Sequence, residues 1–457
     1  MTISSANAKT GYDQLEYHPG FGSAFRSESV PNSLPKYAHV PEKVPYGLYT
    51  EGMTGSAFTA PRASNRRSWL YRIRPSAVHN PYEEYTGNNT LVYNFNQDNT
   101  DEVTSTPQQL RWDPLKVKGA ENLDFVDSIR TICGAGNAQM KSGTAVHWYQ
   151  FGKDMDNKAF YSSDGDFLFL PVKGELLIQT EYGRMHVPPC HIAVVQRNMK
   201  FTVSRVGDHS PNEPASGYMF EVFNNHFVLP DLGPIGGNGL ANIEDFETPT
   251  ACYEDTDDQW TIVNKYGGKL FQYTQDHSPY DVVSWLGNYV PYRYDLQKFC
   301  SVGNISFDHA DPSLQCVLQV PSETPGTSII DFCAFPRRWS AVNDTFRPPW
   351  FHRNIVTEFM AAVAGYAAPK DGCNLHNPGT AHGPDAASTE MGYSGKIPDG
   401  PIQVGAEGSM ICLIETYLPL NPTKWALEES GCLQPNCNDQ WLGIKRHHTL
   451  PESSYAG

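Results

Sequence analysis

The stretch Asp166-Phe167-Leu168-Phe169-Leu170-Pro171 begins a series of short apolar runs that decides the fold. The turn signal Val172-Lys173-Gly174 follows it, and the next run, Glu175 to Glu181, ends at a second turn signal, Tyr182-Gly183. Runs of six or seven residues between turn residues are typical of β-strands. The same series continues with His191 to Gln196 and Tyr218 to Phe223. Successive short strands of this kind favour a sandwich or a jelly roll.

A second series of such runs lies in the C-terminal part of the chain. Its members are Cys316 to Val320, Ser328 to Phe335, Ile355 to Val363 and Ser409 to Thr416. Long segments with a helical apolar period are rare. We therefore predict a mostly β protein with two domains. Two domains are expected because a chain of 50.9 kDa exceeds the usual size of a single core. The first, a β-sandwich-like domain with an extended leading arm, spans 1–290, and the second β domain spans 291–457.

Composition excludes several classes of function. The formal net charge of −16 argues against a nucleic-acid partner, which would require a basic face. There is no run of about 18 apolar residues, and the first residues are polar, so we expect a cytoplasmic protein without a membrane partner. The ten cysteines are scattered, which favours reduced thiols over a disulfide framework.

Two residue pairs in the C-terminal third, one histidine–glutamate and one histidine–histidine, contain candidate metal ligands. His352 precedes Glu358 by six residues, and His376 precedes His382 by the same number. Two histidines and a carboxylate can hold Fe(II) and leave open positions for oxygen and a substrate. In a straight strand, residues six apart lie roughly 20 Å from each other, so the chain must bend between His352 and Glu358 if both are ligands. Asn377-Pro378-Gly379 is a turn signal that can fold His376 and His382 toward one point.

The spacing alone leaves another interpretation open. Fifteen histidines make chance clusters common in a chain of this length, and a histidine near a turn is usually solvated or bonded to the backbone. These ligand spacings also lack the specificity of a zinc CxxC pair.

Several motifs resemble the homogentisate 1,2-dioxygenase family, in one order along nearly the whole chain. They are Gly20-Phe21-Gly22, Gly55-Ser56-Ala57-Phe58-Thr59-Ala60-Pro61-Arg62, Arg67-Ser68-Trp69-Leu70-Tyr71-Arg72-Ile73, Gln109-Leu110-Arg111-Trp112, Asp164-Gly165-Asp166-Phe167, Leu229 to Gly236, Phe307 to Ser313, Phe346 to Asn354 and His382-Gly383-Pro384-Asp385.

The resemblance implies a C-terminal cupin-like jelly roll and a homotrimer or homohexamer. It implies that His352, Glu358 and His382 bind Fe(2+), and that His309 is the acid/base group beside the substrate hydroxyl. The implied reaction opens a hydroquinone ring with O2, converting homogentisate to maleylacetoacetate. Substrate contacts are implied for the remaining site positions, which are His376, Asn354, Tyr366 and Lys370, together with the metal ligand His382.

Departures from the family pattern keep two alternatives open. The family has a tyrosine where this chain has Ala367, although Tyr366 is adjacent, and the segment 365–376 is shorter than usual. This chain also has Leu286 where the family has a histidine, Phe351 where it has a tyrosine and Arg337 where it has a proline. One interpretation of these changes is neutral drift, with Tyr366 covering for Ala367. The other is a less polar pocket wall, as expected for a paralogous iron dioxygenase acting on a bulkier or different hydroxylated aromatic. A non-catalytic cupin-type binding protein is the more remote alternative.

Overall fold

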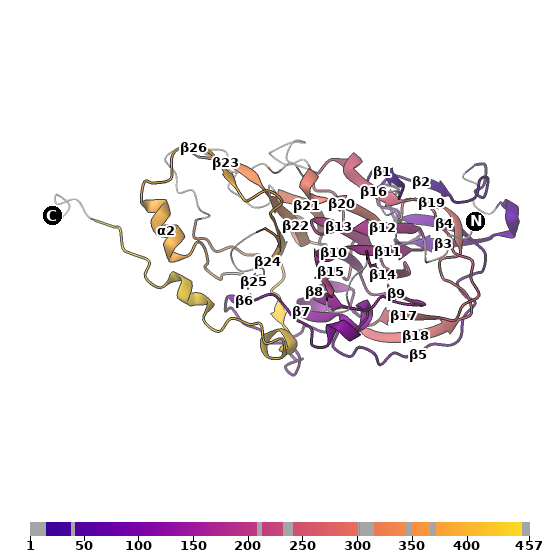
Figure 1. The fold of residues 1–457 in the computed structure, drawn as a ribbon, viewed down its shortest axis with the longest axis horizontal. Coiled ribbons are helices and arrows are strands. Elements are labelled where there is room, and N and C mark those ends of the chain that lie inside the picture. Colours follow the sequence, from indigo (N-terminus) through magenta and orange to yellow (C-terminus); the bar gives the residue numbers. More distant parts are fainter. Residues whose placement is uncertain are drawn as a thin grey trace.

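Strands dominate the computed structural model of the chain (Figure 1). The structure describes residues 15–37, 42–207, 213–231, 241–299, 301, 315–342, 350–365 and 372–449. The helices among them are short, and the two α-helices are α1 (Phe125–Ser128) and α2 (Ala386–Tyr393). The prediction of a mostly β protein is confirmed. Within the described residues, no helix is long and apolar enough to cross a membrane.

A nine-stranded sheet forms the middle layer of the molecule. Its strands, in spatial order, are β1 (Tyr17–Pro19), β16 (Phe246–Pro249), β20 (Tyr292–Asp295), β13 (His191–Val195), β10 (Asp166–Lys173), β15 (Ala215–Val222), β8 (Ser142–Phe151), β7 (Arg130–Asn137) and β28 (Asn421–Pro422). All of these strands pair antiparallel.

A seven-stranded sheet covers one face of this middle layer. Its strands, in spatial order, are β12 (Gly183–Val187), β11 (Leu176–Thr180), β14 (Phe201–Arg205), β9 (Lys158–Ser162), β17 (Trp260–Tyr266), β18 (Lys269–Gln275) and β5 (Glu83–Glu84). Phe167 and Phe169 of β10 pack with Phe160 and Phe201 of this sheet in one buried cluster. The two sheets together form the predicted N-terminal sandwich.

A six-stranded sheet covers the other face of the middle layer. Its strands, in spatial order, are β21 (Cys316–Pro321), β22 (Ser328–Pro336), β27 (Met410–Thr416), β24 (Thr357–Ala364), β25 (Cys373–His376) and β6 (Leu110–Trp112). Phe359 of β24 meets Tyr218 and Phe220 of β15, with ring centroids 5.9 and 6.4 Å apart. With the ribbon of β23 (Arg338–Val342) and β26 (Gly400–Val404), this sheet makes up most of the described C-terminal half.

The middle layer explains why the deciding run is apolar without a break. Successive side chains of a strand point to opposite faces, so Phe167 and Phe169 enter one core while Leu168 and Leu170 enter the other. Both faces of β10 are therefore buried. The chain then leaves this sheet at Gly174, whose φ of +76° is a left-handed conformation that suits glycine, and continues as β11 in the neighbouring layer.

A smaller four-stranded sheet lies at the end of the molecule remote from β24 and β25 (Figure 1). Its strands, in spatial order, are β2 (Phe25–Glu28), β19 (Val282–Gly287), β4 (Arg67–Arg72) and β3 (Tyr49–Thr54). Trp285 of β19 joins it to the sandwich, because its indole lies in the same buried cluster as Phe167 and its Nε1 donates to the carbonyl oxygen of Tyr182 at 2.7 Å.

Each half of the chain contributes a strand to a sheet of the other half. β6 comes from the N-terminal part and pairs with β25 in the six-stranded sheet, where Leu110 lies opposite Leu375. β28 comes from the C-terminal part and pairs with β7 at the edge of the middle sheet. Trp112 of β6 is fully buried, and its Nε1 donates to the carbonyl oxygen of Ala426 at 2.7 Å.

Candidate metal centre

Two neighbouring strands place a carboxylate beside an imidazole. Glu358 is the second residue of β24 and His376 is the last residue of β25, and the antiparallel register sets them directly opposite each other. Directly opposed residues point to the same face of a sheet. Both side chains lie on the face opposite to Phe359, which packs against the middle layer. The site therefore occupies the side of this sheet that faces away from the sandwich.

Two loops bring His352 and His382 to the same place. Their backbones form an isolated antiparallel bridge, with His352 N donating to His382 O at 2.9 Å and His382 N donating to His352 O at 3.0 Å. The turn after His376 closes when Thr380 N donates to Asn377 O at 3.0 Å, and Gly379 in that turn has φ +78°. The bend between His352 and Glu358 and the turn at Asn377-Pro378-Gly379 both agree with the prediction from spacing.

Three side chains converge on one point. His352 Nε2 lies 3.3 Å from Glu358 Oε1, and His382 Nε2 lies 3.3 Å from Glu358 Oε2. One potential ligand atom from each residue falls within 4.8 Å of the others. Glu358 and His382 are buried, whereas His352 is half-buried. One side of the trio is thus accessible.

Hydrogen bonds to the backbone fix how both imidazoles are protonated. His352 Nδ1 lies 3.0 Å from the carbonyl oxygen of Trp350, and His382 Nδ1 lies 2.9 Å from that of Thr380. A carbonyl oxygen only accepts, so each Nδ1 carries a proton. Each Nε2 of a neutral ring then presents its lone pair to the Glu358 carboxylate, which is also an acceptor. A cation between the three groups satisfies all of them, and metal-binding histidines characteristically have such backbone partners on the second nitrogen.

The electrostatics of the trio favour an ionised carboxylate. Burial alone would raise the pKa of Glu358, but His352, His382 and Asn354 outweigh it and hold this pKa well below its usual range. In the metal-free chain a second proton, on Nε2, can take the place of the cation. Its hydrogen bond to Glu358 raises the pKa of His352 against the opposing effect of burial. Two imidazole nitrogens and one carboxylate oxygen match the donor set of a facial triad for non-heme Fe(II), which leaves positions open for other ligands.

His376 is next to the trio but outside it. Its ring centroid lies 3.9 Å from that of His382, and the side chain is buried. Burial, reinforced by the adjacent His382, lowers the pKa of His376 to about 3, so this imidazole is neutral. Its Nδ1 is buried without a hydrogen-bond partner. Asn354 is also brought to the site, where its Nδ2 donates to Glu358 Oε1 at 2.6 Å.

One supporting residue was not predicted from the sequence. Asn377 was interpreted only as part of a turn, yet its buried amide ties together four segments around the site. Its Nδ2 donates to the carbonyl oxygens of Thr106 and Leu420, both at 3.0 Å, and its Oδ1 accepts from Leu420 N at 2.9 Å and from Thr357 Oγ1 at 3.2 Å. Asn377 follows His376 and Thr357 precedes Glu358, so this network fixes the ends of both strands. An asparagine in a turn carries no signal of such long-range contacts.

Three of the predicted site residues, His309, Tyr366 and Lys370, lie outside the described residues, as does Ala367. The described ones, His352, Asn354, Glu358, His376 and His382, are all brought together by the contacts given above.

The expectation that Leu286 alters the pocket wall is wrong for the site within this chain. Leu286 belongs to β19, at the opposite end of the molecule from β24 and β25 (Figure 1), where it packs beside the buried residues Leu34, Val44 and Tyr71. A sheet pairing between β19 and β4 placed it there, and its position in the sequence gave no sign of this. Phe351 does adjoin the site, next to His352 and against Gly383.

Comparison with known proteins decides the family. Residues 16–296 match the family described as homogentisate 1,2-dioxygenase N-terminal, and residues 297–448 match homogentisate 1,2-dioxygenase C-terminal. The chain belongs to the homogentisate 1,2-dioxygenase family. Among curated relatives, the homogentisate 1,2-dioxygenase of Caenorhabditis elegans is 43% identical over 96% of this chain and 99% of its own length. The human enzyme is 44% identical, over 95% of this chain and 97% of its own length. The Drosophila melanogaster enzyme is 44% identical, over 96% of this chain and all of its own length.

Proposed function

We propose that the protein is an Fe(II)-dependent dioxygenase that opens the ring of homogentisate with O2 to give maleylacetoacetate. The reaction balances, because both oxygen atoms of O2 enter the product. The observation that carries the proposal is the convergence of His352, Glu358 and His382, with both Nε2 lone pairs directed at one carboxylate. The full-length relatedness to enzymes of that name supports the choice of substrate.

The bound metal would supply the positions at which a phenolate and O2 meet and the electrons that make O2 reactive. The residues of this chain do the rest. His352, Glu358 and His382 hold the ion, and their backbone partners at Trp350 and Thr380 keep both Nε2 atoms directed inward. We propose His309, on the family resemblance, as the base that takes a proton from the substrate hydroxyl.

His376 and Asn354 are proposed to orient the substrate. The neutral His376 can donate or accept a hydrogen bond without adding charge beside the metal centre, since burial keeps its pKa at about 3. Asn354 holds Glu358 through its Nδ2, and its amide oxygen accepts from Val356 N at 3.2 Å and has a second lone pair for the substrate. We propose Tyr366 and Lys370, on the same resemblance, as further substrate contacts. A homotrimeric or homohexameric assembly and a cytoplasmic location are proposed on the family resemblance, and sedimentation velocity tests the assembly.

Oxygen uptake by the Fe(II)-loaded full chain, with homogentisate as substrate, tests the function. We expect one O2 consumed per homogentisate, a rising absorbance from the conjugated ring-opened product, and loss of both after a ferrous chelator is added. The matched control is Glu175→Gln, because Glu175 pairs with His186 in the N-terminal sandwich, in another layer than the trio. Iron-loaded protein that leaves homogentisate unchanged but consumes O2 with a bulkier hydroquinone would overturn the choice of substrate.

A further inference from the structure

A hollow of about 420 Å³ adjoins the four-stranded sheet. This sheet lies at the end of the molecule remote from β24 and β25 (Figure 1). The lining residues of the hollow are Ala60, Arg62, Asn65, Arg67 and Asn288. Three of these five residues, Ala60, Arg62 and Asn65, come from the connection between β3 and β4, which runs from Gly55 to Arg66. Arg67 is the first residue of β4. The hollow is shallow and opens widely to solvent, so a ligand bound there would be held mainly by polar contacts.

Hydrogen bonds within the connection hold it in one conformation. Ser64 N and Asn65 N both donate to the carbonyl oxygen of Pro61, at 2.9 and 2.8 Å. At the base of the connection, Gly55 N donates to Arg66 O at 3.0 Å and Arg66 N donates to Ser56 Oγ at 2.8 Å. The backbone that carries Arg62 and Arg67 is thus fixed before any ligand arrives.

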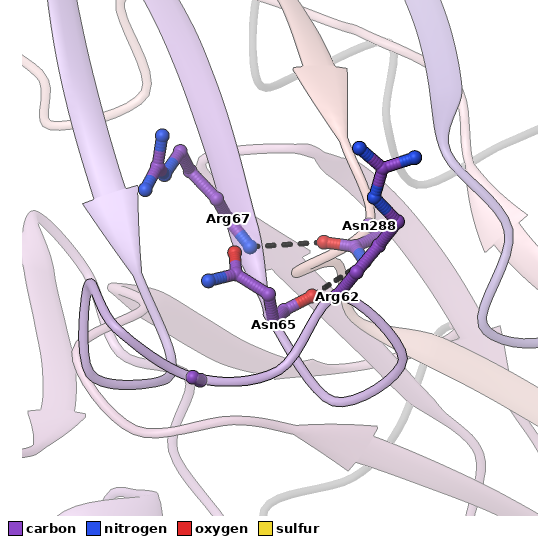
Figure 2. A pocket seen from close by; sticks show the side chains of 5 residues that line it. Arg62, Asn65, Arg67 and Asn288 are labelled. Atoms are coloured by element: carbon purple, nitrogen blue, oxygen red, sulfur yellow. Dashed lines mark hydrogen bonds between the residues drawn. The ribbon is translucent and has the colours of Figure 1, made fainter.

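Asn288, from the end of β19, braces the same connection from the other side. Its Oδ1 accepts from Arg67 N and its Nδ2 donates to the carbonyl oxygen of Asn65, both at 2.9 Å (Figure 2). Gly287 permits this approach, because its φ is +144° and a Cβ there would lie 2.3 Å from Arg67 O. The guanidinium groups of Arg62 and Arg67 extend on either side of Asn65 and Asn288 (Figure 2).

Neither guanidinium group has an acidic partner among the described residues. No salt bridge of the described chain involves Arg62 or Arg67. Arg72, five residues further along β4, is by contrast paired with Asp281, Glu181 and Glu51. Two unpaired arginines in one hollow are conspicuous in a chain with a net charge of −16, where carboxylates are abundant.

An exposed aromatic ring contacts the guanidinium group of Arg67 and determines which of its edges remains free. The Arg67 guanidinium lies 5.9 Å from the ring centroid of Phe58, which is 79% exposed. A guanidinium placed over a ring keeps its N–H edge free for hydrogen bonding. That edge matches two oxygens of a carboxylate or phosphate, which arginine binds with paired hydrogen bonds.

We propose that this hollow binds a small oxyanion, a carboxylate- or phosphate-bearing molecule, through Arg62 and Arg67. The site is separate from the metal centre and does not depend on the proposed reaction. Its half-buried wall is built from the backbone-braced Asn65 and Asn288, and its charge comes from the two arginines. The volume accommodates an organic acid of a few carbons or a phosphate with a small attached group.

Calorimetric titration of the full chain with inorganic phosphate and with succinate, each at constant ionic strength set with chloride, tests the proposal. We expect saturable binding of at least one of the two anions, and the stronger of them identifies the class. Arg62→Gln and Arg67→Gln should each weaken binding by roughly tenfold to a hundredfold, the usual range for loss of a charge-assisted hydrogen bond. Oxygen uptake with homogentisate should be unchanged in both.

Arg66→Gln is the matched control, because it removes the same charge from the same connection while Arg66 does not line the hollow. It should bind the anion as the unmodified chain does. Equal weakening by all three variants would show a diffuse charge effect and overturn the site, as would the absence of saturable binding to either anion. Sedimentation velocity on the same samples measures the oligomeric state. If Arg67→Gln changes that state and neither anion binds, the arginines contact a carboxylate of a second copy of the chain. That result would overturn the small-ligand site.

Discussion

The molecule contains two buried histidine–glutamate contacts that look alike and are completed differently. In the N-terminal sandwich, His147 Nε2 lies 3.1 Å from Glu221 Oε2. In the C-terminal half, His382 Nε2 lies 3.3 Å from Glu358 Oε2. Glu221 also accepts from Lys265 Nζ at 2.9 Å, so a cation of the chain itself completes that site. Among the described residues, no lysine or arginine forms an ion pair with Glu358, and a second histidine lies at 3.3 Å instead.

The comparison distinguishes a buried carboxylate that is paired with a cation of the chain itself from one that requires a bound ligand. A buried charge is costly unless a countercharge accompanies it. Lys265 is itself buried, and it also contacts Asp164 at 2.9 Å, so the sandwich network is closed within the chain. The C-terminal trio leaves two lone pairs and a carboxylate directed at one point, and a metal ion is the partner that fits them.

Substitution of Glu358 should separate the two sites most sharply. Glu358→Gln keeps the shape of the side chain and removes the charge that a metal ion requires. We expect iron content near zero and oxygen uptake at the background rate. The metal-free protein should also lose unfolding free energy, because the ionised carboxylate pairs with both imidazoles. Metal analysis, oxygen electrode measurements and urea unfolding provide the three readouts. An iron-loaded, active Glu358→Gln variant would contradict the assignment of the ligand.

Substitution of Lys265 should give the opposite pattern. Lys265→Met leaves Glu221 buried without its cation, which we expect to cost about 3–5 kcal/mol of unfolding free energy. The metal centre lies in another layer, so iron content per folded chain should stay unchanged. Urea unfolding and metal analysis on the same preparation measure both quantities. Unchanged stability would show that Glu221 is not held as a charge by Lys265.

Acid should weaken the sandwich through Glu221. Burial by itself raises the pKa of this carboxyl, but Lys265 and His147 outweigh it and lower the pKa to about 2. Because the pKa is depressed relative to the unfolded value of about 4.3, the contribution is complete above pH 4.3 and is lost as the pH falls toward 2. It amounts to at most about 3 kcal/mol. Urea unfolding at a series of pH values should show this loss in the unmodified chain, and Glu221→Gln should be less sensitive over the same interval.

Substitution of Asn354 should have the smallest effect among the four predictions, and the effect should be on metal affinity. Asn354→Ala removes the donor to Glu358 Oε1 and leaves all three ligands in place. Loss of a hydrogen bond to a ligand usually weakens metal binding by about tenfold to a hundredfold. Competition with a ferrous chelator measures the affinity, and excess Fe(II) should restore most of the oxygen uptake. Asn436→Ala, a residue of the C-terminal segment with no contact to the trio, serves as the control.

Local patterns in the sequence predicted strands well and their neighbours poorly. The run Asp166 to Pro171 became β10 (Asp166–Lys173), and Ile355 to Val363 became β24 (Thr357–Ala364). Alternation and turn residues act over a few residues, so a sequence can reveal them. Sheet partners depend on distant segments, and nothing local to Leu110 or Asn421 indicated that each strand would join the sheet of the other half.

The same limit applies to the site. Spacing suggested that His376 and His382 fold together, and the turn after His376 explains why this worked. The contact of Glu358 with both His352 and His382 required a strand register and a backbone bridge between loops, which spacing does not contain. The family resemblance identified His352, Glu358 and His382 as the ligands, and the structure places these three side chains together. It did not indicate that Leu286 would lie in another sheet.

The exchange of β6 and β28 between the halves has a consequence for synthesis on the ribosome. The edge partner of β7 is encoded at Asn421–Pro422, more than two hundred residues after β8, and β6 must wait for β25 at Cys373–His376. The N-terminal half therefore emerges with one exposed sheet edge and one unattached strand, and neither defect is repaired until translation is almost finished. A nascent chain of this protein should accordingly depend on chaperones until late in synthesis, and a ribosome stalled anywhere before residue 421 leaves an aggregation-prone product.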